Sequence, residues 1–210
     1  MISQMNEQLR RIVLAGFIKE DTAAQFLEQV TALECTDMVK PISIYIDTYG
    51  GNVDAALCMY DTMKACCCPI VTVGIGKVMS AGVLLLAAGD KGNRFITENT
   101  RVMIHEISGG TFGPISELEH SLAESHRMQD VYVSLLMKDI GKTKTRILKD
   151  MNAEKYMSAA EAVKYGIADK LVPTRKTTRK VAVKTSASRI TQKSKTKKNK
   201  NTSATSKTKK

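Results

Sequence analysis

The 210-residue sequence contains no tryptophan, and its aromatic fraction is only 5%. So few aromatic residues argue against a surface that stacks the bases of single-stranded nucleic acid. No segment approaches the ~20 apolar residues of a membrane-spanning helix. The first residues, MISQMNEQLRR, lack the apolar core of a signal peptide. We therefore expect an unexported, cytoplasmic protein that has no membrane partner.

Zinc-type cysteine spacing is also missing, because the five cysteines form no CxxC pair. They are Cys35, Cys58 and the consecutive Cys66, Cys67 and Cys68. Neighbouring cysteines are poorly placed to pair with each other. We expect free thiols in a reducing compartment and no metal site.

Acidic residues are absent from the C-terminal stretch, residues 174–210, which holds 14 of the 32 basic residues. The first 173 residues keep 18 basic and 21 acidic residues, so the overall charge of +11 resides in the tail and the remainder is at −3. The sequence predicts a globular domain over 1–173 and a disordered Lys/Thr/Ser tail over 174–210, open to contact with polyanions.

Short apolar strands alternate with amphipathic helices through the first 173 residues, which predicts an α/β fold with a largely parallel sheet. The expected strands are Arg11–Ala15, Ile42–Ile46, Ile70–Gly74 and Arg101–Ile104. Helices are expected at Asp21–Glu34, with Asp21 as N-cap, and at Asn52–Cys66.

Two further helices differ in character. Ser80–Ala88 (SAGVLLLAA) is apolar nearly all round, which predicts a helix buried within the domain. Ile115–Ile140 predicts a long amphipathic helix that projects from the domain or packs against a partner. Its expected apolar stripe consists of Leu118, Leu122, Met128, Val131, Leu135 and Leu136.

The strongest chemical signal is a strand, a turn, a serine and a buried helix in IVTVGIGKVMSAGVLLLAAG. A serine that starts a helix is usually only an N-cap, and that reading of Ser80 stays open. The small residues around it, Gly76, Ala81 and Gly82, would leave room for a substrate backbone. Amides of the first helical turn would then point at whatever Ser80 attacks.

Two other segments also place candidate catalytic groups at the end of a strand. YIDTYGGNVDAAL also runs from a strand through glycines into a helix, so Gly51 could offer a second amide to an anion, or Gly50-Gly51 could simply form a tight turn. His105 ends the apolar strand RVMIH and is a candidate general base. The other histidines, His120 and His126, look like exposed positions on the long helix.

Four motifs in order resemble the proteolytic subunits of the Clp protease family. They are YIDTYGGNVDAALCMYDTM, GIGKVMSAGVLLLAAGDKGNRF, TRVMIHEISGG and KYMSAAEAVKYGIADKLV. The likeness runs from about Arg10 to Val172 and needs no insertions between the motifs.

The resemblance implies a crotonase-like spiral of ββα units with a protruding handle helix, which joins two stacked seven-membered rings around a chamber. It implies a serine endopeptidase that degrades or processes unfolded polypeptides and requires no cofactor. Ser80 would be the nucleophile, His105 the base, and the amides of Gly51 and Ala81 the oxyanion hole. A Clp-type ATPase would be its partner.

The sequence departs from the family pattern at three places. The family's third catalytic residue, an aspartate, is Glu154 here, and Asp150 lies one helical turn earlier as the competing candidate. The family's Ser-Pro-Gly-Gly turn reads Thr48-Tyr49-Gly50-Gly51. The segment before RRIVLAG is short where the family forms the loops that touch an ATPase, which leaves that partnership open.

Three alternatives remain from the sequence. A phage-type relative would process capsid proteins. A catalytically silent ring subunit would keep the fold and lose the chemistry, for which Glu154 is the only indication. An acyl-CoA enzyme of the crotonase superfamily would use the oxyanion hole but not a Ser80–His105 pair.

Overall fold

Strands and helices alternate through residues 8–172, the part of the chain that the computed structural model describes. The strands are β1 (Arg11–Ile18), β2 (Ile42–Gly51), β3 (Ile70–Met79), β4 (Arg94–Ile96), β5 (Arg101–Ile104), β6 (Lys155–Ser158) and β7 (Lys170–Leu171). The helices are α2 (Glu20–Thr36), α3 (Val53–Ala65), α4 (Ala81–Ala87), α5 (Ile115–Ile140), α6 (Lys144–Asn152) and α7 (Ala159–Tyr165). The expected basic tail lies outside these residues, so its disorder and the domain boundary stay predictions.

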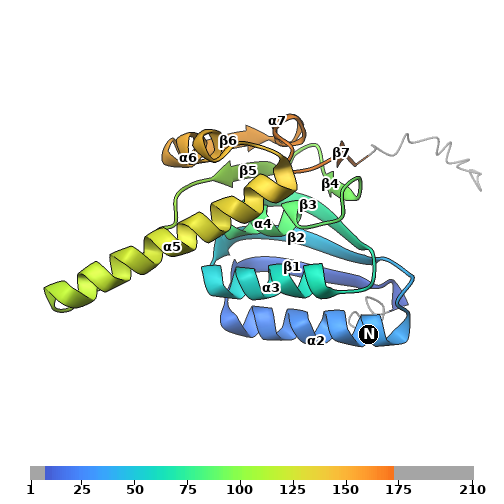
Figure 1. The fold of residues 1–210 in the computed structure, drawn as a ribbon. Coiled ribbons are helices and arrows are strands. Elements are labelled where there is room, and N and C mark those ends of the chain that lie inside the picture. The colour runs from blue at the N-terminus through green and yellow to red at the C-terminus, as the bar shows by residue number, and fades with distance from the viewer. Residues whose placement is uncertain (1–7, 173–210) are drawn as a thin grey trace, which may run out of the picture. The chain divides into compact units, whose positions relative to one another are not determined.

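The strands form one sheet in the order β1-β2-β3-β4-β7, all paired in parallel (Figure 1). β3 has two partners on the same edge: its first half pairs with β4, and its last residues, Lys77–Met79, pair in parallel with β5. β6 then adds to β5 antiparallel. This arrangement confirms the expected α/β class with a largely parallel sheet, and it brings the ends of β3 and β5 together.

The apolar residues that predicted the strands and helices lie in the core. In β2, Ile42, Ile44 and Ile46 alternate with partly exposed residues and are fully buried. Helices α2 and α3 pack against each other (Figure 1), and α4 packs against β2 and β3. All seven residues of α4 are buried, which confirms the expected internal helix.

One expected cap is wrong and another is confirmed. The N-cap of α2 is Lys19, whose side chain makes no capping bond, and Asp21 lies inside the first turn. A carboxylate in the first turn is stabilised by the positive end of the helix dipole, so acidic residues are common near helix N-termini. This preference is why Asp21 indicated the start of the helix. In α3, by contrast, the Asn52 side chain accepts a hydrogen bond from the amide of Ala55 at 2.9 Å.

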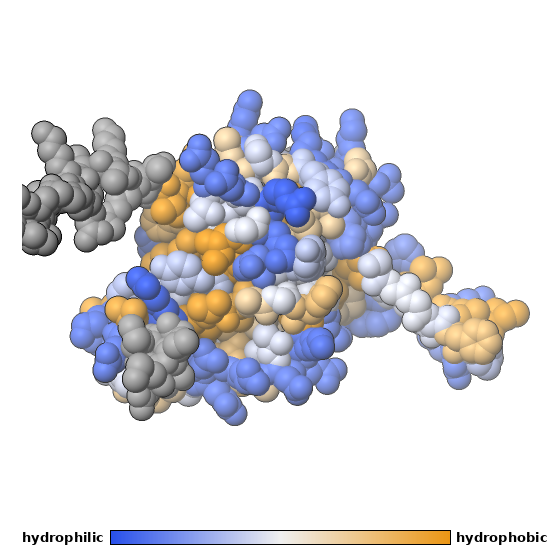
Figure 2. Space-filling model, turned by 180° about the vertical axis from the view of Figure 1, so that it is seen from behind, coloured by the Kyte–Doolittle hydropathy of each residue, from blue (hydrophilic) through white to orange (hydrophobic). Residues whose placement is uncertain are grey.

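Helix α5 projects from the rest of the described residues along its N-terminal half (Figure 1). Its buried residues, Tyr132, Val133, Leu136 and Ile140, all lie in the second half. The expected projection of this helix is therefore confirmed, and it leaves Leu118 and Leu122 of the expected apolar stripe exposed, Leu122 at 59%. Apolar side chains at the start of the projection, Phe112 and Ile115, are also exposed, and apolar surface is visible on the projecting part in Figure 2.

A buried ion pair fastens β4 to the segment before β7. Arg94 donates to both carboxylate oxygens of Asp169, at 2.6 Å from Nη2 and 2.9 Å from Nε. The amides of Gly92 and Arg94 donate to the same carboxylate. Burial alone would raise the pKa of Asp169, but these hydrogen bonds outweigh it and hold that pKa below its ordinary value. The Arg94 side chain is only 4% exposed, so it depends on Asp169 for its counter-charge.

Asp169→Asn is expected to lower the melting temperature at pH 7 by about 6–12 °C, because an unpaired buried guanidinium costs about 3 kcal/mol. A carboxylate whose pKa is lower in the folded protein stabilises it fully above the ordinary aspartate pKa of about 4, and this stabilisation is lost as the pH falls through the folded value. The difference between wild type and variant should therefore shrink below pH 4.

Thermal melting at one fixed protein concentration across pH 3–7 measures this effect. Asp130→Asn is the matched control, because its partner Lys144 and Asp130 itself are both more than half exposed. Equal melting temperatures for Asp169→Asn and Asp130→Asn at pH 7 would contradict the assignment.

Candidate active site

Ser80 lies in the turn between β3 and α4 with a strained backbone, φ 53° and ψ −126°. Positive φ is costly for a residue with a Cβ and persists only where the surroundings enforce it. Here the Ser80 amide donates to the carbonyl of Met103 on β5 at 2.8 Å. The side chain makes no capping bond to α4, so Ser80 does not act as the ordinary N-cap that the sequence left open.

His105 follows β5 directly and meets Ser80, because β5 pairs with the last residues of β3. His105 Nε2 and Ser80 Oγ are 2.8 Å apart. With the ring proton on Nδ1, Nε2 accepts the serine hydroxyl proton, which is the arrangement a general base requires. The structure thus brings together the two side chains that the sequence singled out from distant segments.

The glycine turn after β2 packs directly against the Ser80 turn. A Cβ on Gly50 would lie 2.6 Å from the Ser80 Cβ, and one on Gly51 would collide with the carbonyl oxygen of Ile18. Both glycines have positive φ, 97° and 150°. The buried Thr48 hydroxyl accepts from the Gly50 amide at 2.9 Å and so holds the turn that lacks the family's proline. Only glycine fits at these two positions.

A pocket of about 40 Å³ opens over these groups. Its lining consists of Gly51, Val53, Ser80, Ala81, His105, Glu106, Ile107, Ser108 and Tyr132. Ala81 is the first residue of α4, where the backbone amide has no intrahelical acceptor. Gly51, Ala81, Ser80 and His105 therefore share one small hollow, as the sequence predicted.

Tyr132 on α5 is a contact that the sequence analysis missed. Its hydroxyl donates to the Ser80 carbonyl oxygen at 3.0 Å, and the ring is buried. Burial raises the pKa of Tyr132, so the phenol stays a donor at neutral pH. A tyrosine among the buried residues of a long helix was the available signal, since its hydroxyl must find a partner.

The two candidates for a third catalytic residue, Glu154 and Asp150, differ in their surroundings. The pairing of β5 with β6 ends at Ile104 and Lys155, so His105 and Glu154 are the residues that adjoin its last pair. Glu154 itself is exposed and has positive φ, 45°. Among residues 8–172, no side-chain hydrogen bond joins a carboxylate to His105.

Asp150 is held elsewhere. Its carboxylate is buried and accepts from Arg146 Nε at 2.5 Å, from the Tyr165 hydroxyl at 3.0 Å and from Lys155 Nζ at 3.3 Å. Burial alone would raise the pKa of Asp150, but these three hydrogen bonds hold it below the ordinary aspartate value. Its partners tie α6 to β6 and α7, which is a structural task.

The remaining candidate groups offer no second site of this kind. His120 and His126 are exposed on α5, as expected. All five cysteines are free thiols. Within residues 8–172, no group of three His, Cys, Asp or Glu side chains is placed to hold a metal ion. The same residues include no helix that is both long and apolar enough to cross a membrane.

A comparison with known protein families finds a match that covers this site. The family model described as Clp protease matches residues 1–175, which is most of the chain and includes every segment of the pocket. The match also covers the Gly50–Gly51 turn, the Ser80 turn and the α6–β6 region that carries Asp150 and Glu154. The chain therefore belongs to the Clp protease family, a family of peptidases.

Proposed function

We propose that the chain is a serine endopeptidase in which Ser80 and His105 perform acyl transfer on unfolded polypeptides. The observation that carries this proposal is the 2.8 Å contact between Ser80 Oγ and His105 Nε2, at a strained turn that opens on a pocket. Strain at a serine that caps nothing is typical of a functional site rather than of a structural turn.

In the proposed reaction, Ser80 Oγ attacks the scissile carbonyl carbon while its proton passes to His105 Nε2. The amides of Gly51 and Ala81 would donate to the resulting oxyanion. His105 then gives the proton to the leaving amine as the C–N bond breaks, and the acyl group stays on Ser80. Water, deprotonated by His105, hydrolyses the ester and restores the serine hydroxyl.

Glu154 is the proposed acceptor for the His105 Nδ1 proton. The β5–β6 pairing supports this choice, since His105 and Glu154 each adjoin its last pair, Ile104 and Lys155. The commitment of Asp150 to three other partners supports it as well. Asp150 remains the competing candidate on residue type alone.

The projecting half of α5 supports a ring assembly as part of this proposal. Ile115 is 75% exposed, and Leu122 is exposed nearby on the same helix. Exposed apolar side chains on a helix that leaves its own domain are suited to contact with another copy of the chain. We propose a cytoplasmic homo-oligomer of stacked rings, heptameric by resemblance, that admits unfolded substrate from a Clp-type ATPase or, in a phage-type relative, processes capsid proteins.

A silent ring subunit is the second candidate, favoured by the lack of a hydrogen bond between His105 and any carboxylate of residues 8–172. Cleavage assays with an unfolded protein and short peptides, combined with electron microscopy of the same sample, separate the two. The peptidase should form rings and cleave both substrates. Rings without cleavage of either substrate would support the silent subunit, and cleavage that survives in Ser80→Ala would point to contamination or another site.

Tyr132→Phe is expected to lower kcat by about fivefold with little change in KM. Its hydroxyl makes a neutral hydrogen bond that contributes about 1 kcal/mol, and it fixes the backbone of the nucleophile rather than the substrate. The change should leave the pH profile of kcat/KM in place, since the phenol does not titrate near neutral pH.

Steady-state kinetics over pH 6–9 provide the measurement, and Tyr156→Phe provides the control. Tyr156 is exposed on β6 and its hydroxyl forms no hydrogen bond among the residues described. A kcat for Tyr132→Phe equal to that of Tyr156→Phe would show that the contact with Ser80 has no part in catalysis.

A further inference from the structure

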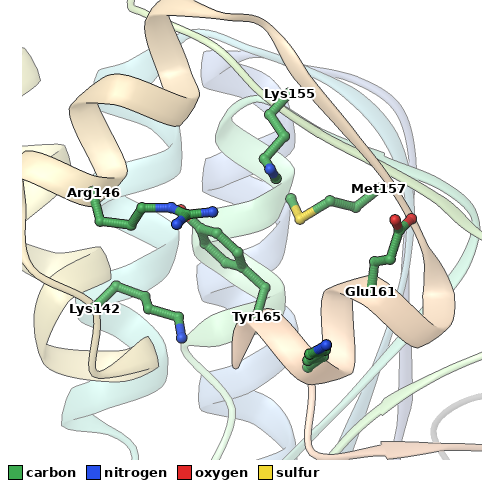
Figure 3. A pocket seen from close by; sticks show the side chains of 7 residues that line it. Lys142, Arg146, Lys155, Met157, Glu161 and Tyr165 are labelled. Atoms are coloured by element: carbon green, nitrogen blue, oxygen red, sulfur yellow. The ribbon is translucent and has the colours of Figure 1, made fainter.

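A second hollow lies on the side of the domain formed by α6, β6 and α7 (Figure 3). Its volume is about 300 Å³, which is at the lower end of the range for small-molecule sites. The lining residues are Lys142, Arg146, Lys155, Met157, Glu161, Lys164 and Tyr165. None of them lines the pocket over Ser80, so this hollow is separate from the proposed active site.

Four of the seven lining residues are cations, and they come from four segments of the chain. Lys142 lies between α5 and α6, Arg146 in α6, Lys155 in β6 and Lys164 in α7. In Figure 3 the head groups of Lys142, Arg146 and Lys155 gather around the ring of Tyr165. Like charges in one hollow repel each other unless anions compensate them, and they focus a positive potential there.

Compensation by the protein is incomplete. Asp150 is shared by Arg146 and Lys155, so one carboxylate serves two cations. Glu161 is occupied at the start of α7, where it accepts from the Ser158 amide at 2.8 Å and from the Ser158 hydroxyl at 2.7 Å.

The other two cations stay unmatched. Neither Lys142 nor Lys164 forms an ion pair with another residue of the described part, 8–172. With four cations and two carboxylates, the hollow keeps an excess of two positive charges.

The floor of the hollow suits a ligand with some apolar surface. Tyr165 is buried beneath the cations, with Lys142 Nζ 5.6 Å from its ring centre, and Met157 lies beside it. The Arg146 guanidinium keeps a fork of N–H donors besides the Nε that bonds Asp150. Such a fork, with two lysines beside it, matches the oxygens of a phosphate.

We propose that this cationic pocket binds a phosphate-type dianion, either inorganic phosphate or the phosphate group of a small organic ester. The excess of two charges matches a dianion. Lys142 and Lys164, which form no ion pair within residues 8–172, supply the charged contacts.

Isothermal titration of the full-length protein with inorganic phosphate tests this proposal, with chloride used to keep the ionic strength constant. Wild type should bind one phosphate per chain saturably. The double variant Lys142→Gln/Lys164→Gln should bind at least about tenfold more weakly, because it loses two charge-assisted contacts. The control Lys138→Gln/Lys170→Gln removes the same charge at two exposed lysines outside the pocket and should bind within about twofold of wild type.

Phenyl phosphate provides the second arm. Tighter binding of phenyl phosphate than of inorganic phosphate identifies an organic ester as the ligand, through contact with Tyr165 and Met157, and equal binding identifies inorganic phosphate. The methyl resonance of Met157, assigned with Met157→Leu, should shift with either ligand and reports on this pocket alone. Neither readout depends on peptidase activity.

Two results would overturn the site. One is binding that is equally strong in the pocket variant and the control, which would assign it to the basic residues after Thr174 or to other surface charge. The other is an unmoved Met157 resonance at saturating phosphate in wild type. Melting temperatures close to that of wild type would show that both double variants are folded.

Discussion

Ser80→Ala and His105→Ala should each abolish peptide hydrolysis, with losses in kcat of up to ~10⁶, and the double variant should be hardly worse than either single one. The two side chains lie 2.8 Å apart and act as one unit, since the serine is a weak nucleophile without a base to take its proton. Steady-state kinetics of the four proteins measure the coupling directly.

Cys58→Ala is the control, because it removes an exposed nucleophilic side chain from α3. It should keep wild-type activity. The melting temperatures of the Ser80 and His105 variants should stay near that of wild type, so that a lost activity reflects lost chemistry. If the loss in kcat of the double variant equals the product of the two single losses, Ser80 and His105 contribute independently, contrary to the proposed mechanism.

Glu154→Gln should lower kcat by up to ~10⁴, because the neutral amide no longer stabilises the imidazolium or fixes the tautomer of His105. Glu154→Asp should stay active, since it keeps a carboxylate at this position. The hydrogen bond that this role requires is absent from the structure, so substrate binding would have to complete it. Catalytic hydrogen bonds are often long or unformed before substrate binds.

Asp150→Asn should behave differently from Glu154→Gln. The change should affect stability rather than activity, because Asp150 is buried and neutralises Arg146 and Lys155. Its loss should lower the melting temperature by several degrees, while kcat of the folded enzyme stays near wild type. A crippled kcat at an unchanged melting temperature would identify Asp150 as the catalytic acid. If neither change affects kcat, the enzyme works with Ser80 and His105 alone.

The main elements were predictable because their apolar periodicity reflects burial. Ile42, Ile44 and Ile46 alternate as a half-buried strand should, and the continuous apolar run after Ser80 became the internal helix α4. The short strands β4 and β7 were missed, because three residues and two residues carry no periodic signal. They are held by partners remote in sequence, such as Arg94 with Asp169.

The main residues of the candidate site were predictable from the sequence, but the side chains that hold them in place were not. Ser80, His105 and Gly51 belong to motifs that local sequence displays. Tyr132 could not be assigned to Ser80, because 52 residues separate them and only the packing of α5 brings them together. The role of Asp150 was hidden in the same way, since its contact with Tyr165 depends on how α7 folds back on α6.

The burial of polar residues was also not predictable from the sequence. Arg10, the residue just before β1, is typical of a surface position in the sequence. It is nevertheless buried and donates to the carbonyls of Leu33, Asp37 and Lys40. Nothing in the sequence distinguishes it from the exposed Arg11 next to it. Such positions are fixed by which carbonyls the fold leaves without donors.

Labelling with a fluorophosphonate probe tests the central claim most directly, because the probe traps a serine only where a base and an oxyanion site activate it. The account predicts one adduct per chain by intact mass, mapped to Ser80 by peptide sequencing, and none in Ser80→Ala or His105→Ala. A folded wild-type protein that stays unlabelled, or an adduct that persists in Ser80→Ala, would contradict it.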